Sequence, residues 1–253
     1  MIRVLAVPLL VSVFVAAQAS PPSLPDHEAF VRDTRNNLAR SQREQNRFAY
    51  KERRTELHTN PFGRLGTGDT VVYEVTPSED GKMVTRRLVE RNGQAVQDGT
   101  IETRNLPQPQ TAAGRTRRSG FEDSVAMLDF ALDHRETLKG RSTIVVTFTP
   151  KADAKPETSQ GRIARLFKGS VWVDEEKREV VRIEATAVDD ISVGLGLVAR
   201  LNEGTKATLT REQVEGGIWL PTSIRFAGQG RALLFRRLNV DQRIEWFNYR
   251  KIN

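Results

Sequence analysis

Residues 168–187 read KGSVWVDEEKREVVRIEATA, and this stretch decides the fold class. Val171 and Val173 lie two residues apart on either side of Trp172, and apolar side chains alternate with polar ones in residues 181–187. A period of two is typical of β-strands that bury one face. The charged residues 174–179 between the two runs are typical of a turn. The segment therefore predicts a β-hairpin.

The same period recurs on both sides of this hairpin. Further alternating runs cover residues 48–58, 70–75, 83–88, 144–148, 207–209, 220–226, 233–235 and 244–246. Short turns join successive runs, so antiparallel pairing between neighbours is expected. About 9–11 strands result, and a sheet of this length has to curl in order to bury one face. We predict a mainly β (α+β) protein with a strongly curved antiparallel half-barrel sheet.

Two segments have the period of a helix instead. The first begins after Asp26, a typical N-cap residue, and continues to about residue 46. Its less polar stripe consists of Phe30, Thr34, Leu38 and Ser41. The second covers residues 121–132. Its stripe consists of Phe121, Val125, Leu128 and Leu132.

Three segments are expected outside regular elements. Residues 97–120 and 151–160 are polar and predict loops. Residues 191–201 place Gly194 and Gly196 among apolar side chains, and glycine lowers the preference for helix or strand. This segment is either a mobile apolar flap or a loop packed under the core. The second interpretation is favoured, because apolar loops are usually packed.

The first 19 residues have the features of a secretory signal peptide. Arg3 precedes an apolar run over residues 4–15, and Ala17-Gln18-Ala19 matches a cleavage site after Ala19. The run is shorter than the roughly 20 residues of a spanning helix, and no cysteine follows it. We predict an exported, periplasmic protein. Its expected parts are a signal peptide (1–19), a flexible leader (20–25) and a single domain (26–253).

Composition limits the chemistry. The chain has no cysteine, which excludes disulfides, thiol chemistry and thiolate metal sites. Its formal net charge is +7, which favours anionic partners. We do not expect nucleic acid as a partner, because the protein is predicted to be exported. An anionic membrane surface is the candidate anionic partner. The alternative is that the charge only keeps the protein in solution.

The chain contains no recognisable catalytic motif. Its three histidines lie far apart in the sequence, and none belongs to a metal-binding or nucleophile pattern. We therefore assign no catalytic residue, no metal and no cofactor, and we expect a non-catalytic protein. The remote alternative is a hydrolase, in which His58 or His134 would meet a serine or carboxylate in one cleft.

Short segments of the chain resemble a known family. They are residues 138–141, 169–174, 181–184 and 217–224, which read LKGR, GSVWVD, VRIE and GIWLPTSI. Paired strands of this kind are similar to those of the lipoprotein-localisation-factor (LolA/LolB-like) superfamily. The resemblance implies an unclosed, curved antiparallel sheet. The helices at 26–46 and 121–132 would form a lid, and the hollow between sheet and helices would hold acyl chains.

The expected function follows from this resemblance. It implies a periplasmic carrier or binding protein for lipoprotein acyl chains or another apolar lipid ligand. The alternative is an envelope structural or sensor module that binds a protein partner through the same fold. Candidate cavity-lining residues are Phe148, Trp172, Ile183, Leu220 and Ile224. Alternation alone does not tell which face of the sheet is concave, and a tryptophan such as Trp172 also suits the core.

Overall fold

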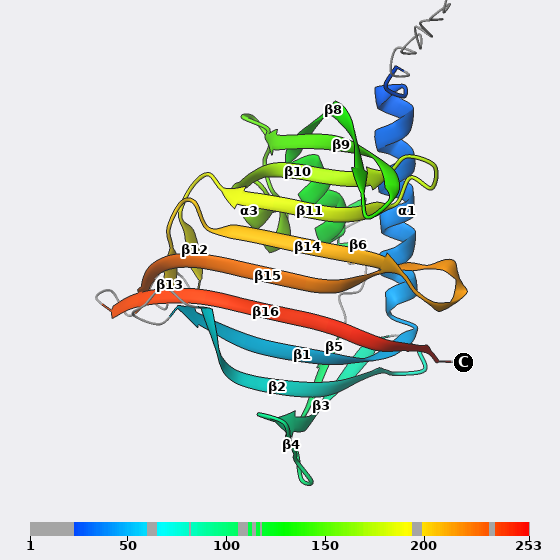
Figure 1. Cartoon of the computed structure of the whole chain (residues 1–253). Helices are drawn as coiled ribbons and strands as arrows, with labels where there is room; N and C mark the ends of the chain where they lie inside the picture. The colour runs from blue at the N-terminus through cyan, green and yellow to red at the C-terminus, as the bar shows by residue number, and fades with distance from the viewer. Residues whose placement is uncertain are drawn as a thin grey trace, which may run out of the picture.

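One large antiparallel sheet dominates the computed structural model (Figure 1). The structure describes residues 23–59, 65–80, 82–105, 111–112, 115–116, 118–193, 199–232 and 236–252. Within these ranges the sheet has 14 strands, is strongly curved and does not close on itself. The first and last long strands of the chain pair with each other in the middle of the sheet.

The long strands follow a nearly sequential order. From one edge to the other they are β3 (Met83–Arg91), β2 (Leu65–Pro77), β1 (Phe48–Thr59), β16 (Arg236–Lys251), β15 (Trp219–Ala232), β14 (Lys206–Gln213), β11 (Val180–Ala187), β10 (Phe167–Asp174), β9 (Arg141–Pro150) and β8 (Leu128–Leu138). Short strands extend it: β4 (Gln94–Ala95), β5 (Ile101–Asn105), β12 (Ile191–Val193) and β13 (Ala199–Leu201). A separate ribbon pairs β6 (Thr111–Ala112) with β7 (Arg115–Thr116).

Tight turns set the pairing of neighbouring strands. Lys139 and Gly140 join β8 to β9 with positive φ angles of 50° and 77°. Asn92 and Gly93, after β3, have φ angles of 50° and 81°. Two successive residues with positive φ form the turn whose twist matches that of the flanking strands. These turns therefore favour the hairpins that the sequence predicted.

The helices lie against one face of the sheet. The longest, α1 (His27–Gln45), begins at Asp26, whose side chain accepts a hydrogen bond from the Ala29 N–H. It contacts both β8 and β15, so it runs across the strands (Figure 1). Two short helices, α2 (Gly120–Ala126) and α3 (Ser159–Ala164), pack on each other. A 3₁₀ turn, η1 (Glu215–Gly217), precedes β15.

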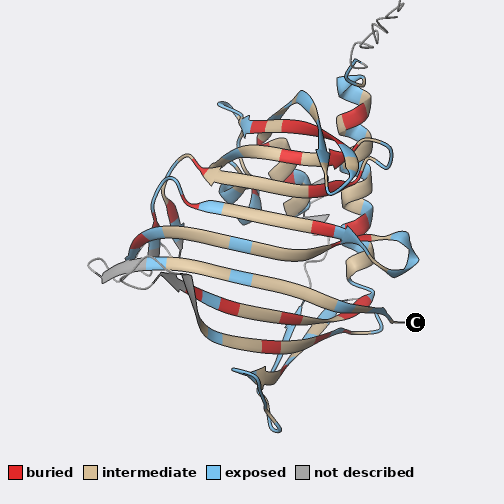
Figure 2. Cartoon of the chain, in the orientation of Figure 1, coloured by how far each residue is buried: buried red, intermediate tan, exposed pale blue. Residues whose placement is uncertain are grey.

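The main core lies between α1 and strands β9–β11. Its buried members are Phe30, Ile144, Val146, Phe148, Val171, Val173 and Val180. A smaller cluster contains Ala187, Ile191 and Leu201, against which Phe167 and Phe226 pack. Figure 2 shows buried bands on β9 and β10, whereas β15 and β16 are mostly intermediate. Strands β9 and β10, which pack against the helices, are therefore more buried than β15 and β16.

The predicted fold class is confirmed. The hairpin at 168–187 forms as β10 and β11, and the helix predicted for residues 26–46 forms as α1. The estimate of about 9–11 strands is too low for the 14 strands of the sheet. One reason is that residues 97–120, predicted as a loop, contain β5, which pairs with β3.

The helix predicted for residues 121–132 is wrong beyond residue 126. The helix α2 ends there, and β8 begins at Leu128. Leu128 and Leu132 fit a helical stripe that starts at Phe121. Together with Phe130 they also form an apolar row with a period of two, which is typical of a strand. Pairing of Phe130 with Phe148 and of Leu132 with Val146 makes this segment a strand. The resulting ladder of hydrogen bonds outweighs local propensity.

The ends of the segment 191–201 are packed. Ile191 and Leu201 are buried and face each other in the pair of β12 and β13. Gly194 and Gly196 lie outside the described residues, as does the signal peptide predicted for residues 1–19. No helix in the described part of the chain has the length and apolar character needed to cross a membrane.

Candidate functional site

An apolar cavity lies between the helices and strands β8–β11. Its volume is about 200 Å³. Five lining residues come from α1, three from α2 and eight from the four strands. They are Phe30, Val31, Thr34, Arg35, Leu38, Phe121, Ser124, Val125, Leu128, Phe130, Val146, Phe148, Val171, Val173, Val180 and Ile183.

The floor of the cavity is a row of directly paired strand residues. Val171 on β10 lies opposite both Val146 on β9 and Ile183 on β11. Opposed residues of antiparallel strands share one face of the sheet. This inner face meets α1, whereas neighbours such as Trp172 point to the other side. Alternation in the sequence therefore produces a continuous apolar floor.

The two hydroxyl groups of the lining do not make the cavity polar. Thr34 Oγ1 donates to the Phe30 carbonyl oxygen at 2.8 Å. Ser124 Oγ donates to the Gly120 carbonyl oxygen at 2.7 Å. Each hydroxyl thus bonds to the preceding turn of its own helix, a common arrangement for serine and threonine in helices. Neither hydrogen is left for a water molecule in the cavity.

Arg35 is the one charged residue of the lining. Its guanidinium carbon lies 5.1 Å from the centre of the Phe130 ring, within cation–π distance. Partial burial lowers the pKa of Arg35, because desolvation disfavours the charged form. The cation therefore lies where the apolar wall meets solvent.

Exposure shows on which side the cavity opens. The floor residues Val146 and Val173 are 4% and 1% exposed. Val31, Val125 and Phe130, on α1, α2 and β8, are half-buried. The accessible side of the cavity therefore includes residues of the helices and the edge strand. Ile183 on β11 is also half-buried, so the cavity is accessible at this strand as well.

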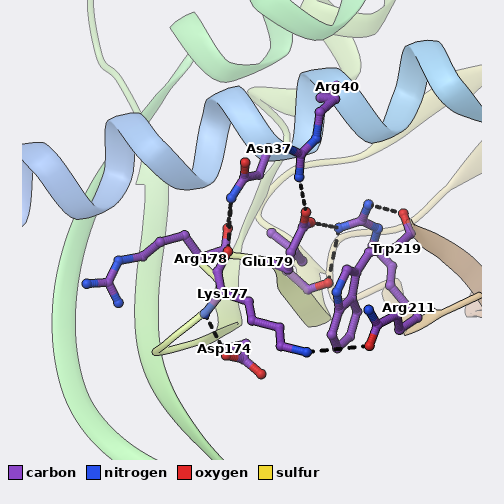
Figure 3. A network of polar contacts seen from close by, with 10 residues as sticks. Asn37, Arg40, Asp174, Lys177, Arg178, Glu179, Arg211 and Trp219 are labelled. Atoms are coloured by element: carbon purple, nitrogen blue, oxygen red, sulfur yellow. Dashed lines mark hydrogen bonds and ion pairs between the residues drawn. The ribbon is translucent and has the colours of Figure 1, made fainter. Parts of the chain in front are cut away.

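A buried carboxylate links α1 to the sheet (Figure 3). The carboxylate of Glu179, only 4% exposed, lies 3.1 Å from Arg40 on α1 and 3.6 Å from Arg211 on β14. Arg211 also donates to the carbonyl oxygens of Val180 at 3.1 Å and Trp219 at 2.6 Å. These contacts join β11, β14 and β15 to the helix that roofs the cavity.

A second buried carboxylate positions α2. Asp123 is fully buried and accepts hydrogen bonds from the Glu157 N–H, the Thr158 N–H and the Thr158 hydroxyl at 2.8–2.9 Å. Ser119 and Glu122 form a capping box at the start of the same helix. The segment before α3 therefore holds α2 in place at the rim of the cavity.

The structure places the five candidate residues differently. Phe148 and Ile183 line the cavity. Trp172 lies on the outer face, where its indole N–H donates to Glu136 at 2.9 Å. Leu220 is fully buried outside the lining, and Ile224 lies two strands from Ile183 on the same inner face.

The lining residues on α1 and α2 were not predicted as ligand contacts from the sequence. Those on α1 could have been found, because Phe30, Thr34 and Leu38 belong to the stripe predicted for the first helix. Arg35 had no such signal, since it falls on the polar side of that stripe.

A second recess is larger but polar. Its volume is about 350 Å³, and it surrounds the irregular pairing of β1 with β16 near Tyr50 and Tyr249. Glu74 in its wall already accepts a hydrogen bond from Arg87 at 2.6 Å, which lowers the pKa of Glu74. Burial raises the pKa of Tyr50 to about 12. Lys51 and Arg250 also line this recess, and their charges help to lower the pKa of Glu74. Because its wall is charged, we take the apolar cavity as the site of an apolar ligand.

The hydrolase alternative gains no support from the described residues. His134 is exposed and lies near Asp133 and Glu136 of its own strand, at 3.1 Å and 3.7 Å. It does not line the cavity. The side chain of His58 lies outside what the structure describes. Within the described ranges, no group of three or more histidine, aspartate or glutamate residues is arranged to hold a metal ion.

Comparisons with known proteins find only distant structural likenesses. No family model and no curated protein matches the chain. It is similar to the structure of a DUF1329 family protein from Desulfovibrio piger, with 16% identity, a TM-score of 0.37, and coverage of 87% of this chain and 92% of that one. It is similar to an outer membrane lipoprotein-sorting protein domain from Vibrio parahaemolyticus, with 12% identity, a TM-score of 0.36, and coverage of 86% and 93%. It is also similar to a LolA superfamily protein from Nitrosomonas europaea, with 12% identity, a TM-score of 0.35, and coverage of 86% and 93%.

The observed topology can be compared with the arrangement expected from the sequence. An unclosed, curved antiparallel sheet capped by helices is the arrangement that the LolA/LolB-like resemblance implies. This chain adds an apolar cavity between the sheet and the helices. Fold does not determine function, so the chemistry of the cavity decides what the protein can bind.

Proposed function

We propose that the protein binds an apolar ligand, a lipoprotein or lipid acyl chain, in the cavity beneath α1 and α2. The observation that supports this most is the chemistry of the lining, where Arg35 is the only charge and both hydroxyl groups bond to their own helices. Such a lining offers water few hydrogen-bond partners, and an apolar cavity of about 150 Å³ in another protein binds benzene. The space of about 200 Å³ is therefore available to hydrocarbon.

The size of the cavity sets the strength of binding. Scaling from benzene, it accommodates a segment of about six to eight carbons. Each buried methylene contributes about 0.8 kcal/mol, so the gross gain is about 5–6 kcal/mol before the entropic cost of binding. A longer chain would contact the half-buried inner face beyond Ile183, where Leu209, Ile224 and Ile244 continue the paired row.

The setting of this activity is part of the proposal. A signal peptide over residues 1–19 would deliver the protein to the periplasm, where acyl chains of lipoproteins and lipids need shelter from water. The net charge of +7 would favour approach to an anionic membrane surface. The protein would act there as a carrier or binding protein, without catalysis.

A second candidate function is binding of a protein partner through the sheet edge. All five residues of β5 are exposed, and Ile101 on this edge strand is 62% exposed. An exposed edge offers backbone groups to an added strand. This function would predict capture of an extended peptide at β5, with the cavity left empty.

Titration with a neutral apolar probe tests the first proposal. The purified protein is titrated with N-phenylnaphthylamine, whose fluorescence rises in apolar surroundings. We expect saturable binding that is lost in Val125→Phe, because the larger side chain would occupy the cavity. Val89→Phe, at a half-buried position of β3 outside the lining, is the matched control and should bind as the original protein does. Equal binding by both variants would overturn the proposal.

A further inference from the structure

The lining of the cavity has one cation, the guanidinium of Arg35 on α1. Among the described residues, no carboxylate lies within 4.0 Å of the Arg35 guanidinium, whereas Arg32 and Arg40 on the same helix form ion pairs. Arg43, further along α1, shares this lack of an ion pair but does not line the cavity. The pKa of Arg35 is lowered by burial alone, with no compensating acid. A positive charge that has lost part of its hydration without gaining a counter-charge is an arrangement that an anionic ligand would stabilise.

The contacts of Arg35 suit a ligand with two parts. Its guanidinium lies over the Phe130 ring at 5.1 Å, and Phe130 itself lines the cavity. The polar head of a ligand at Arg35 would therefore adjoin a hydrocarbon chain among Phe130, Leu38 and Val31. A planar guanidinium pairs with a carboxylate through two parallel hydrogen bonds. One unpaired cation also matches one negative charge.

We propose that Arg35 binds the carboxylate of a fatty acid whose hydrocarbon chain fills the cavity. This inference rests on the proposed function, because it takes the cavity as the site of the chain and adds the identity of the head group. The single charge of Arg35 favours a monoanion, and the volume of about 200 Å³ favours a chain of medium length. Arg35 is thus a specificity residue, whereas the apolar lining supplies most of the affinity.

The test compares two ligands that differ only in the head group. Octanoate and octanol are each used, at neutral pH, to displace N-phenylnaphthylamine from the purified protein. The variants are Arg35→Gln and Arg43→Gln. Arg43 is the matched control, because it lies on the same helix, about 12 Å further along, does not line the cavity and has no ion pair within the described ranges. Both substitutions remove one positive charge.

We expect Arg35→Gln to weaken octanoate binding about tenfold, the lower end of what a hydrogen bond to a charged group contributes. Octanol binding should stay within twofold of the original value, and Arg43→Gln should change neither ligand. Arg35→Lys, which keeps the charge without the planar fork, should give an intermediate loss for octanoate.

The possible failures are distinguishable. If the original protein binds neither octanol nor the neutral probe, the proposed function itself is wrong. If both bind but Arg35→Gln and Arg43→Gln weaken octanoate equally, or neither weakens it, the assignment of Arg35 is wrong and the cavity proposal stands. If Arg35→Gln weakens octanol as much as octanoate, Arg35 shapes the cavity and does not recognise the head group.

Discussion

Replacing Arg211 with methionine should destabilise the protein by about 3–5 kcal/mol, because the change leaves a buried carboxylate without its main partner. Arg211 and Glu179 are 3% and 4% exposed, and their charged groups lie 3.6 Å apart. The substitution would also remove hydrogen bonds to two backbone carbonyl groups, at 3.1 Å and 2.6 Å. Arg40 would remain near Glu179, but its side chain is 63% exposed, so it cannot replace a buried partner.

The free energy of unfolding would be measured by urea titration with far-ultraviolet circular dichroism, since Trp219 lies too close to Arg211 for fluorescence alone. The matched control is Arg225→Met. Arg225 pairs with Asp241 at 2.8 Å, but its side chain is 44% exposed, so its loss should cost less than about 1 kcal/mol. Equal effects of the two substitutions would refute the conclusion that burial makes the Glu179–Arg211 pair decisive for the roof of the cavity.

The effect of Arg211→Met should also depend on pH in a defined direction. Burial raises the pKa of Glu179, and Arg211 partly opposes this shift. Without Arg211 the folded-state pKa would rise further above the unfolded value. The variant should therefore lose most stability at neutral pH, and the difference from the original protein should shrink as acidification protonates Glu179. A difference that stays constant between neutral and acidic pH would contradict this explanation.

Three further substitutions test other contacts. Phe148→Ala removes a side chain that is 6% exposed and should lower the free energy of unfolding by about 3–5 kcal/mol in urea titration, while enlarging the cavity for apolar probes. Gly169→Ala would place a methyl group 1.9 Å from a backbone carbonyl oxygen of β11, so it should cost about 1–3 kcal/mol by the same assay, whereas Ser170→Ala should cost less than about 0.5 kcal/mol. Hydrogen bonding to Arg135 lowers the pKa of Glu175 to about 2, so the stability from this pair should be lost as pH falls toward that value; Glu175→Gln should flatten this part of the pH profile.

The sequence predicted the strands well, because a sheet with one buried face leaves a clear period of two. It also predicted α1, since Asp26 is an N-cap residue and Phe30 begins the stripe that packs on the sheet. The boundary between α2 and β8 was not predictable from local pattern. Leu128 and Leu132 fit both periods, and only pairing with β9 decides between them.

The cavity was predictable only in part. Alternation separates Val171 from Trp172, but it does not tell which of the two faces the helices cover. That choice depends on where α1 docks, which the distant contact of Arg40 with Glu179 fixes. Arg35 could not be found from its pattern, because a charged residue on a weakly amphipathic helix is usually solvated. The proposal that Arg35 binds a ligand depends on its position in the cavity lining and on the absence of a carboxylate partner within the described residues.

The most direct test of the central claim is mass spectrometry of molecules extracted from the purified protein. We expect the protein to carry a fatty acid or another acyl-chain molecule in near-stoichiometric amount, or to take it up from vesicles, and Val125→Phe to carry far less. Val89→Phe should carry as much as the original protein. If the original protein carries nothing after purification and takes up nothing from vesicles, the cavity is not an acyl-chain site and the account is wrong.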